Sequence, residues 1–125
     1  MDFSRKVRFV ASGHVTDPPA NITFASVVSR DSVRLAFLIA ALNDLHVLGA
    51  DIRNAYLNAM TSEKVHTICG LEFGQAYLGR FAIITRALYG LKSSGAAWRN
   101  TLAGTLGDLG FVSTLADPDV YSSHN

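Results

Sequence analysis

The chain has 125 residues, of which 49% are hydrophobic and 17% are charged, so it is long enough for one domain or part of one and too apolar to be disordered. Eleven basic and ten acidic side chains give a formal net charge of +1. That balance excludes an overall electrostatic attraction to nucleic acid, to a membrane surface or to acidic substrates, so any nucleic-acid contact needs a local patch.

The first part of the chain predicts one strand and one long helix. Charged and apolar residues alternate from Arg5 to Ser12, which is typical of a half-buried strand, and an Asp-Pro-Pro sequence then breaks it. Ser29 and Asp31 are both suitable N-caps for a helix over Asp31–Leu45. Between Leu35 and Leu42 this helix is apolar on nearly every face. We therefore expect it to need cover on several sides and to be poorly soluble without that cover.

The rest of the chain predicts short strands, a helical turn and a second helix. Apolar runs between glycine or polar residues indicate strands, and a serine-capped apolar stripe that stops at a glycine indicates a helix. The sum is an α+β fold with a small, mostly antiparallel sheet packed with helices. In chain order the elements are a strand over His46–Ile52, a helical turn over Asn54–Met60, strands over Lys64–Cys69 and Phe81–Arg86, and a helix from Ser93 or Ser94 to Leu109 that Gly110 ends.

Asp51 is the strongest candidate for a catalytic side chain. It ends a predicted strand among small and apolar neighbours, where a carboxylate is costly to bury unless a cation or donors compensate. A strand that turns into a helix after an aspartate can bring the residue five positions on, Tyr56, beside the carboxylate. The ring would then face a nucleotide sugar while the carboxylate holds a metal. The alternative is an aspartate that caps the turn at Asn54 and a tyrosine in the core, and by spacing alone that alternative is the stronger one.

The block from Ala87 to Trp98 is the second candidate. Gly90 and Lys92 precede a serine-capped helix start, where backbone donors and the helix dipole favour anions such as phosphate. The alternative is an ordinary turn and N-cap, with Trp98 as a core anchor, and local sequence favours that alternative.

Other residue types limit the kinds of site and the cellular location that the sequence allows. The single cysteine, Cys69, excludes an internal disulfide and favours an intracellular, cytoplasmic location. The four histidines lack zinc-site spacing, the longest apolar run is too short to cross a bilayer, and Walker A and nucleophile-elbow motifs are absent. Arg5, Lys6 and Arg8 form a candidate basic patch, for which a solvated strand edge is the alternative that composition favours.

Six stretches carry a family resemblance through their order and spacing. They are 6–13 (similar to K-x-R-L-V-A-x-G), 24–28 (F-A-P-V-V), 32–35 (S-I-R-L), 50–58 (M-D-V-K-T-A-F-L-N), 87–92 (A-L-Y-G-L-K, identical, with A-W at 97–98), and 109–111 with 116–121 (L-G-F and A-D-P-x-x-Y). Together they resemble the reverse transcriptase domain of copia-type retrotransposon polyproteins, an RNA-directed DNA polymerase.

The resemblance implies a partial right-hand polymerase fold. Residues 1–125 would be an N-terminal fragment that supplies part of the fingers and the first half of the palm and is truncated before the Y-V-D-D hairpin. Family chemistry is phosphoryl transfer with two magnesium ions. Asp51 would be catalytic and a magnesium ligand, together with the backbone carbonyl of Ile52, and Tyr56 would be the steric gate against a ribose 2′-hydroxyl. The implied nucleotide-binding residues are Tyr56, Tyr89, Gly90, Lys92, Lys6 and Arg8.

The implied partners are an RNA/DNA primer–template, deoxynucleoside triphosphates and the remaining polyprotein segments, with no membrane. For the intact element, the location would be cytoplasmic, particle-associated or nuclear. Two local departures from the family pattern stand out: Ser93-Ser94-Gly95 replaces Q-A-P, and residues 65–70 differ from V-Y-M-x-Q-P.

A further departure decides the expected activity. No two aspartates are adjacent in the 125 residues, and one carboxylate cannot hold two magnesium ions in catalytic geometry. We therefore expect a polymerase fragment that is inactive alone. The alternatives are a non-enzymatic nucleic-acid-binding remnant and a small α+β interaction domain without a nucleotide role.

Overall fold

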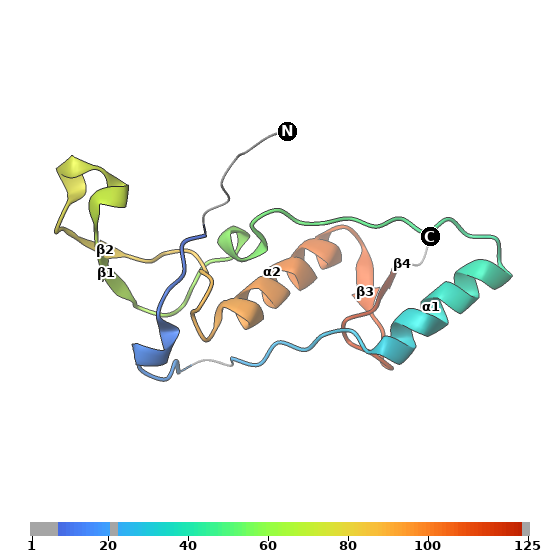
Figure 1. Cartoon of the computed structure of the whole chain (residues 1–125). Coiled ribbons are helices and arrows are strands. Elements are labelled where there is room, and N and C mark those ends of the chain that lie inside the picture. Colours follow the sequence, from blue (N-terminus) through green and yellow to red (C-terminus); the bar gives the residue numbers. More distant parts are fainter. Residues whose placement is uncertain (1–7, 21–22, 124–125) are drawn as a thin grey trace, which may run out of the picture. The chain divides into compact units, whose positions relative to one another are not determined.

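The chain folds as a small α+β protein. The computed structural model describes residues 8–20 and 23–123. These contain the helices α1 (Arg30–Leu42) and α2 (Ser94–Asp108) and two antiparallel two-stranded sheets, as Figure 1 shows. One sheet pairs β1 (His66–Ile68) with β2 (Phe81–Ile83), and the other pairs β3 (Phe111–Ser113) with β4 (Tyr121–Ser123). The predicted α+β class is confirmed, but two separate two-stranded antiparallel sheets replace the one small sheet that was expected.

The chain divides into two compact units. The first unit comprises Met1–Phe24 and Asn54–Arg99, and the second comprises Ala25–Arg53 and Asn100–Asn125. Neither helix of the described residues is long and apolar enough to cross a membrane.

The first unit is built on a long β-hairpin. Strands β1 and β2 pair in the register His66 with Ile83, and backbone hydrogen bonds continue beyond them, from Ile84 to Val65 and from Ala87 to Ala59. The predicted strands over Lys64–Cys69 and Phe81–Arg86 are thus confirmed in position and direction, although the regular ladder is shorter. The hairpin leads the chain to residues 87–93, which include the buried residues Ala87, Leu88, Leu91 and Ser93.

Two backbone segments cross at close range in that core. The Ala11 N–H donates to the Tyr89 carbonyl at 2.7 Å, and Val10 and Tyr89 form a parallel bridge. A Cβ on Gly13 would collide with the Gly90 carbonyl oxygen, and a Cβ on Gly90 would collide with the Ala11 carbonyl oxygen. Gly90 also has φ +93°, a region that side chains disfavour. Glycine is therefore required on both sides of the crossing.

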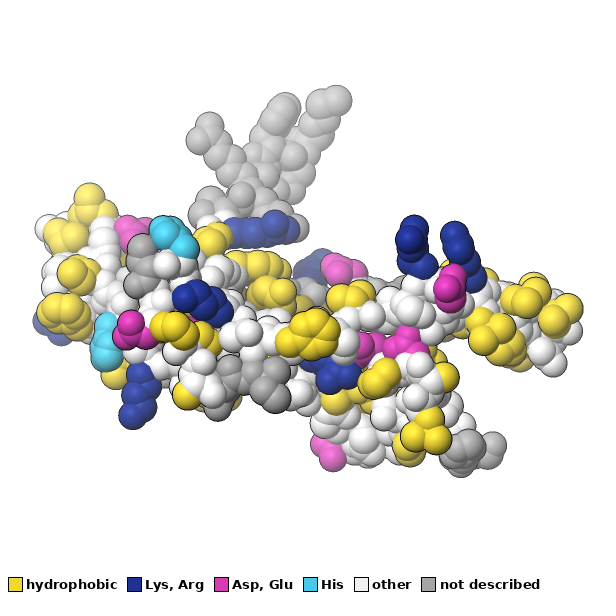
Figure 2. All heavy atoms as spheres, turned by 90° about the horizontal axis from the view of Figure 1, so that it is seen from below, with side chains coloured by type: hydrophobic (Ala, Val, Ile, Leu, Met, Phe, Trp, Pro, Cys, Tyr) yellow, Lys and Arg dark blue, Asp and Glu magenta, His cyan; other side chains and the backbone are white. Residues whose placement is uncertain are grey.

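The second unit contains the long apolar helix. Ser29 is the N-cap of α1, and its hydroxyl accepts from the Ser32 N–H, which confirms one of the two predicted caps. None of the residues of α1 is buried, and Phe37 and Leu42 are 57% and 75% exposed. Figure 2 shows hydrophobic side chains at the surface over this helix. The described residues thus do not supply the cover that this apolar helix was expected to need.

Two expectations for the strands were wrong or incomplete, and one pair of strands was not predicted. Residues 46–52 are extended but form no strand, because no other segment of the described chain pairs with them, and a strand needs a partner to satisfy its backbone groups. The described part of the predicted strand Arg5–Ser12 contributes only the Val10 bridge, and residues 5–7 lie outside the described residues. The hairpin of β3 and β4 was not predicted.

Substitution of Gly13 by alanine tests the crossing. We expect Gly13→Ala to lower the free energy of unfolding by about 2 kcal/mol, because the added methyl meets a backbone oxygen that cannot rotate away. Urea unfolding followed by circular dichroism and by Trp98 fluorescence measures this change.

Gly104→Ala is the matched control, because a Cβ at Gly104 on α2 meets nothing within 4 Å. It should stabilise the helix by about 1 kcal/mol. An equal response of both variants would contradict the required close approach at Gly13.

Candidate functional site

The turn at residues 87–93 is held from several sides. Ala87 and Ser94 are almost fully buried. The Ser94 hydroxyl accepts from the Leu88 N–H at 3.0 Å and donates to the Leu88 carbonyl at 2.7 Å, which closes the turn on itself. The crossing with Ala11 fixes Tyr89 from outside. The most specific motif of the sequence thus forms a turn that hydrogen bonds hold at Ala87, Leu88 and Tyr89.

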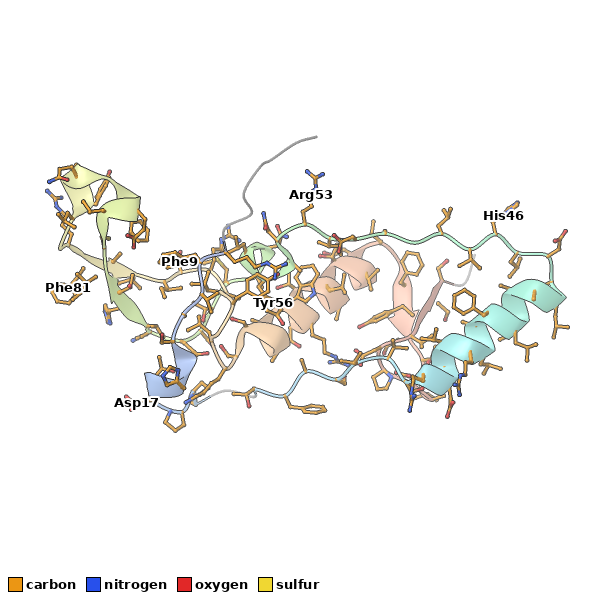
Figure 3. All side chains as sticks on the ribbon, viewed as in Figure 1. Phe9, Asp17, His46, Arg53, Tyr56 and Phe81 are labelled. Atoms are coloured by element: carbon orange, nitrogen blue, oxygen red, sulfur yellow. The ribbon has the colours of Figure 1, made fainter. Side chains whose placement is uncertain are left out.

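Three of the predicted nucleotide-binding side chains come together beside this turn. Tyr56 projects from the 3-10 helix Ala55–Asn58 (Figure 3). It contacts Tyr89 with ring centroids 4.8 Å apart and ring planes inclined by 47°. The Arg8 guanidinium lies over the Tyr89 ring, 5.6 Å from its centroid. Arg8, Tyr56 and Tyr89 come from three separate parts of the sequence, and we call them the aromatic cluster. Such a cluster of two rings and one cation can stack against a base or sugar and attract phosphate.

The other predicted residues of this region have separate positions. The Lys92 ammonium donates to the Thr16 carbonyl at 2.9 Å and is exposed, so it ties the turn to the N-terminal segment. Gly90 serves the backbone crossing described above. Lys6 lies outside the described residues, so the structure says nothing of its role.

The N-terminus of α2 already holds a carboxylate of the protein itself. Glu63 accepts hydrogen bonds at one oxygen from the Ser93 N–H, at 2.8 Å, and from the Ser93 hydroxyl. The predicted alternatives for this helix start were a phosphate site and an ordinary cap. The Ser93 hydroxyl donates to Glu63, so the serine side chain does not itself cap the helix, and the phosphate site stays a prediction. The cap comes from a residue thirty positions away, which the local sequence did not predict.

A polar cleft of about 520 Å³ lies next to this contact. Two segments line it, Thr16–Ala20 and Ser62–His66, so Glu63 belongs both to the cleft wall and to the cap of α2. No motif in the sequence indicated this cleft.

Asp51 and Ile52 lie in the extended stretch between α1 and the turn at Asn54. Asp51 is exposed, in contrast to the partly buried position at a strand end that the sequence suggested, because the strand is absent. His46 and Arg53 project from the same stretch (Figure 3). Asp51 belongs to the second unit and Tyr56 to the first. The proposed pocket of carboxylate and ring stays a prediction.

The described residues do not fit a two-magnesium site. Among residues 8–20 and 23–123, no three His, Cys, Asp or Glu side chains come together in an arrangement that could hold a metal ion. A polymerase-type site needs several carboxylates around two ions. Asp51 can therefore act as a metal ligand only with donors from elsewhere.

Two carboxylates, Asp117 and Asp119, lie in a turn of the second unit. Asp117 is buried, and its carboxylate accepts from the Ser32 hydroxyl at 2.6 Å, from the Ser29 N–H at 2.9 Å and from the Asp119 N–H at 3.1 Å. It thus fastens the N-terminus of α1 to the loop between β3 and β4. The hydrogen bond from Ser32, followed by those from Ser29 and Asp119, lowers the pKa of Asp117 from 3.8 to about 2.

Comparison with known proteins identifies the class. The model of the reverse transcriptase (RNA-dependent DNA polymerase) family matches residues 1–124. The chain belongs to this family, as the six motifs suggested. No solved structure matches the chain.

The similar proteins are retrotransposon polyproteins. The chain is 27% identical over 119 residues to the retrovirus-related Pol polyprotein from transposon RE1 of Arabidopsis thaliana, covering 93% of the chain and 8% of that protein. It is 31% identical over 110 residues to the transposon Ty1-BL Gag-Pol polyprotein of Saccharomyces cerevisiae, covering 84% of the chain and 6% of that protein. The chain therefore spans less than a tenth of the length of these relatives.

The low pKa of Asp117 predicts an acid-sensitive α1. Because the folded-state pKa lies below the ordinary 3.8, the ionised carboxylate stabilises the fold above about pH 4, and this stability is lost as the pH falls through about 2. We expect Asp117→Asn to lower the melting temperature at pH 7 and the difference from the wild type to shrink between pH 4 and pH 2. Melting curves recorded across this range measure it.

Asp108→Asn is the control, because Asp108 is exposed at the end of α2. A constant difference between wild type and Asp117→Asn down to pH 2 would show that the ionised form gives no stability.

Proposed function

We propose that this chain is a segment of a retrotransposon reverse transcriptase that contributes one metal-binding carboxylate and a nucleotide-facing surface to a larger polymerase. On this proposal it corresponds to part of the fingers and the first half of the palm of a right-hand fold, and residues 1–125 act as one partial domain. Its reaction in the assembled enzyme is template-directed transfer of deoxynucleotides to a primer.

The aromatic cluster is the observation that carries this proposal. Family resemblance assigns Arg8, Tyr56 and Tyr89 to the nucleotide, although 33 to 81 positions separate them in the sequence. In the structure the two rings are in contact and the guanidinium lies over one of them. Residues that resembled the family only by chance would not be expected to lie in contact in this way. In the proposed role Tyr56 blocks a ribose 2′-hydroxyl, and Tyr89 and Gly90 lie beneath the sugar.

The proposed role of Asp51 depends on other polyprotein segments. Asp51 and the Ile52 carbonyl would hold magnesium together with carboxylates that the described residues do not bring to it. Magnesium, when bound, activates the primer hydroxyl and stabilises the leaving pyrophosphate. We therefore propose that the 125-residue chain alone does not polymerise, and that its partners are the primer–template, deoxynucleoside triphosphates and the remaining polyprotein.

A primer-extension assay tests the proposed inactivity. The purified 125-residue chain, with an RNA template, a DNA primer, magnesium and four deoxynucleoside triphosphates, should give no extension above background. Measurable extension that disappears in Asp51→Asn would contradict the proposal, because one carboxylate would then suffice.

Nucleotide binding tests the aromatic cluster directly. We expect dATP with magnesium to shift the NMR signals of the Tyr89 and Gly90 amides, and Tyr89→Ala to weaken this binding about tenfold, since one aromatic stacking contact is worth about 1–3 kcal/mol. Titrations of the wild type and of Tyr89→Ala with dATP measure this change in affinity.

Tyr77→Ala is the matched control, because Tyr77 lies exposed near the tip of the β1–β2 hairpin, away from the cluster residues in sequence. It should bind dATP as the wild type does. Equal affinities for all three proteins, or no binding to any of them, would remove the nucleotide role from the cluster.

A further inference from the structure

Glu63 contacts the end of the turn that carries Tyr89 and Gly90. It lies just before β1, and one of its oxygens accepts both the N–H and the hydroxyl of Ser93. Ser93 is only 3% exposed, so this contact is shielded from water on the side of the turn. The contact joins the hairpin to the last residue before α2.

The contact also completes the N-terminus of α2. The first N–H groups of a helix lack partners within it and carry positive partial charge, so a carboxylate placed there is favourable. The Ser93 carbonyl accepts from the Ala97 N–H at 2.9 Å, which makes Ser93 the cap position. Since Glu63 binds the cap residue at two donors, it fixes the rotation of Ser93 as well as its position.

Fixing Ser93 constrains the turn between Leu88 and Ser93. At one end the Ser94 hydroxyl holds both backbone groups of Leu88. At the other end Lys92 and Ser93 are tied to different segments, through the Thr16 carbonyl and Glu63. Tyr89 and Gly90 span the short stretch between these anchors. Loss of one anchor therefore frees the backbone that aims the Tyr89 ring.

The serines involved are those that depart from the family pattern. Where the family reads Q-A-P, this chain has Ser93-Ser94-Gly95. Both serines use their hydroxyls on the turn, Ser93 with Glu63 and Ser94 with Leu88. The two serines that depart from the family pattern thus have their own hydrogen-bond partners in the chain.

We propose that Glu63 is a positioning residue for nucleotide binding, which acts through Ser93 on the turn that presents Tyr89 and Gly90. This inference rests on the proposed function of the aromatic cluster. Glu63 itself touches no cluster residue in this role, and its effect on nucleotide affinity is transmitted by the backbone.

Amide hydrogen exchange of the 125-residue chain tests the positioning step. Glu63→Ala should speed exchange of the Ala11 and Leu88 amides at least tenfold, because the first bonds the Tyr89 carbonyl and the second bonds Ser94. The Ile84 amide, which bonds Val65 in the hairpin, should change less than twofold. Glu63→Gln keeps the acceptor oxygen and should behave as the wild type does.

Titration with dATP and magnesium gives the functional readout. Glu63→Ala should bind at least fivefold more weakly than the wild type, and Glu63→Gln should restore binding to within twofold. Glu72→Ala is the charge-matched control, because Glu72 is an exposed acidic residue in the hairpin loop of the same unit. It should leave both readouts unchanged.

The outcomes separate the two proposals. Unchanged exchange at Ala11 and Leu88 in Glu63→Ala, or equal acceleration at Ile84, overturns the positioning role whether or not dATP binds. If Glu63→Ala fails to fold, Ser93→Ala carries the test, with a smaller acceleration expected because the Ser93 N–H still donates. Failure of the wild type to bind dATP defeats the proposed function, and the exchange pattern still decides whether Glu63 orders the turn.

Discussion

A single backbone contact organises the first unit of this protein. The Ala11 N–H donates to the Tyr89 carbonyl at 2.7 Å, and glycines on both sides, Gly13 and Gly90, allow the two segments to come this close. The contact brings the N-terminal segment onto the turn and with it Arg8 onto the Tyr89 ring. With any larger residue at the crossing, the segments would separate and the aromatic cluster would lose its cation. The site therefore depends on glycine at positions 13 and 90 as much as on the side chains of the aromatic cluster.

Local signals in the sequence predicted the elements that local forces determine. Ser29 caps α1, the arms of the β1–β2 hairpin fall within the two predicted strands, and α2 begins at a predicted serine. Each of these follows from hydrogen bonding or side-chain periodicity over a few residues. The order of the family motifs predicted more about the site than periodicity did, because it singled out Tyr56 and Tyr89, which are in contact.

Contacts between distant residues were the part that the sequence did not reveal. Glu63 and Ser93 are thirty positions apart, and Asp117 and Ser32 are eighty-five apart. Neither pair has a pattern of its own, since a glutamate before a strand and a serine before a helix each have ordinary local explanations. The strand expected at residues 46–52 failed for the same reason. Its apolar sequence favours extended backbone, but only a neighbouring strand, which local sequence cannot specify, turns it into part of a sheet.

The tie between Asp117 and α1 has a consequence for synthesis on the ribosome. The Asp117 carboxylate accepts hydrogen bonds from Ser29 and Ser32, which are translated 88 and 85 positions before it. At about 5–20 residues per second, α1 waits roughly 4–17 s for its anchor to leave the exit tunnel. During that interval this thirteen-residue helix lacks the carboxylate that binds its N-terminus. The N-terminus of α1 therefore gains this anchor only after Asp117 has been translated.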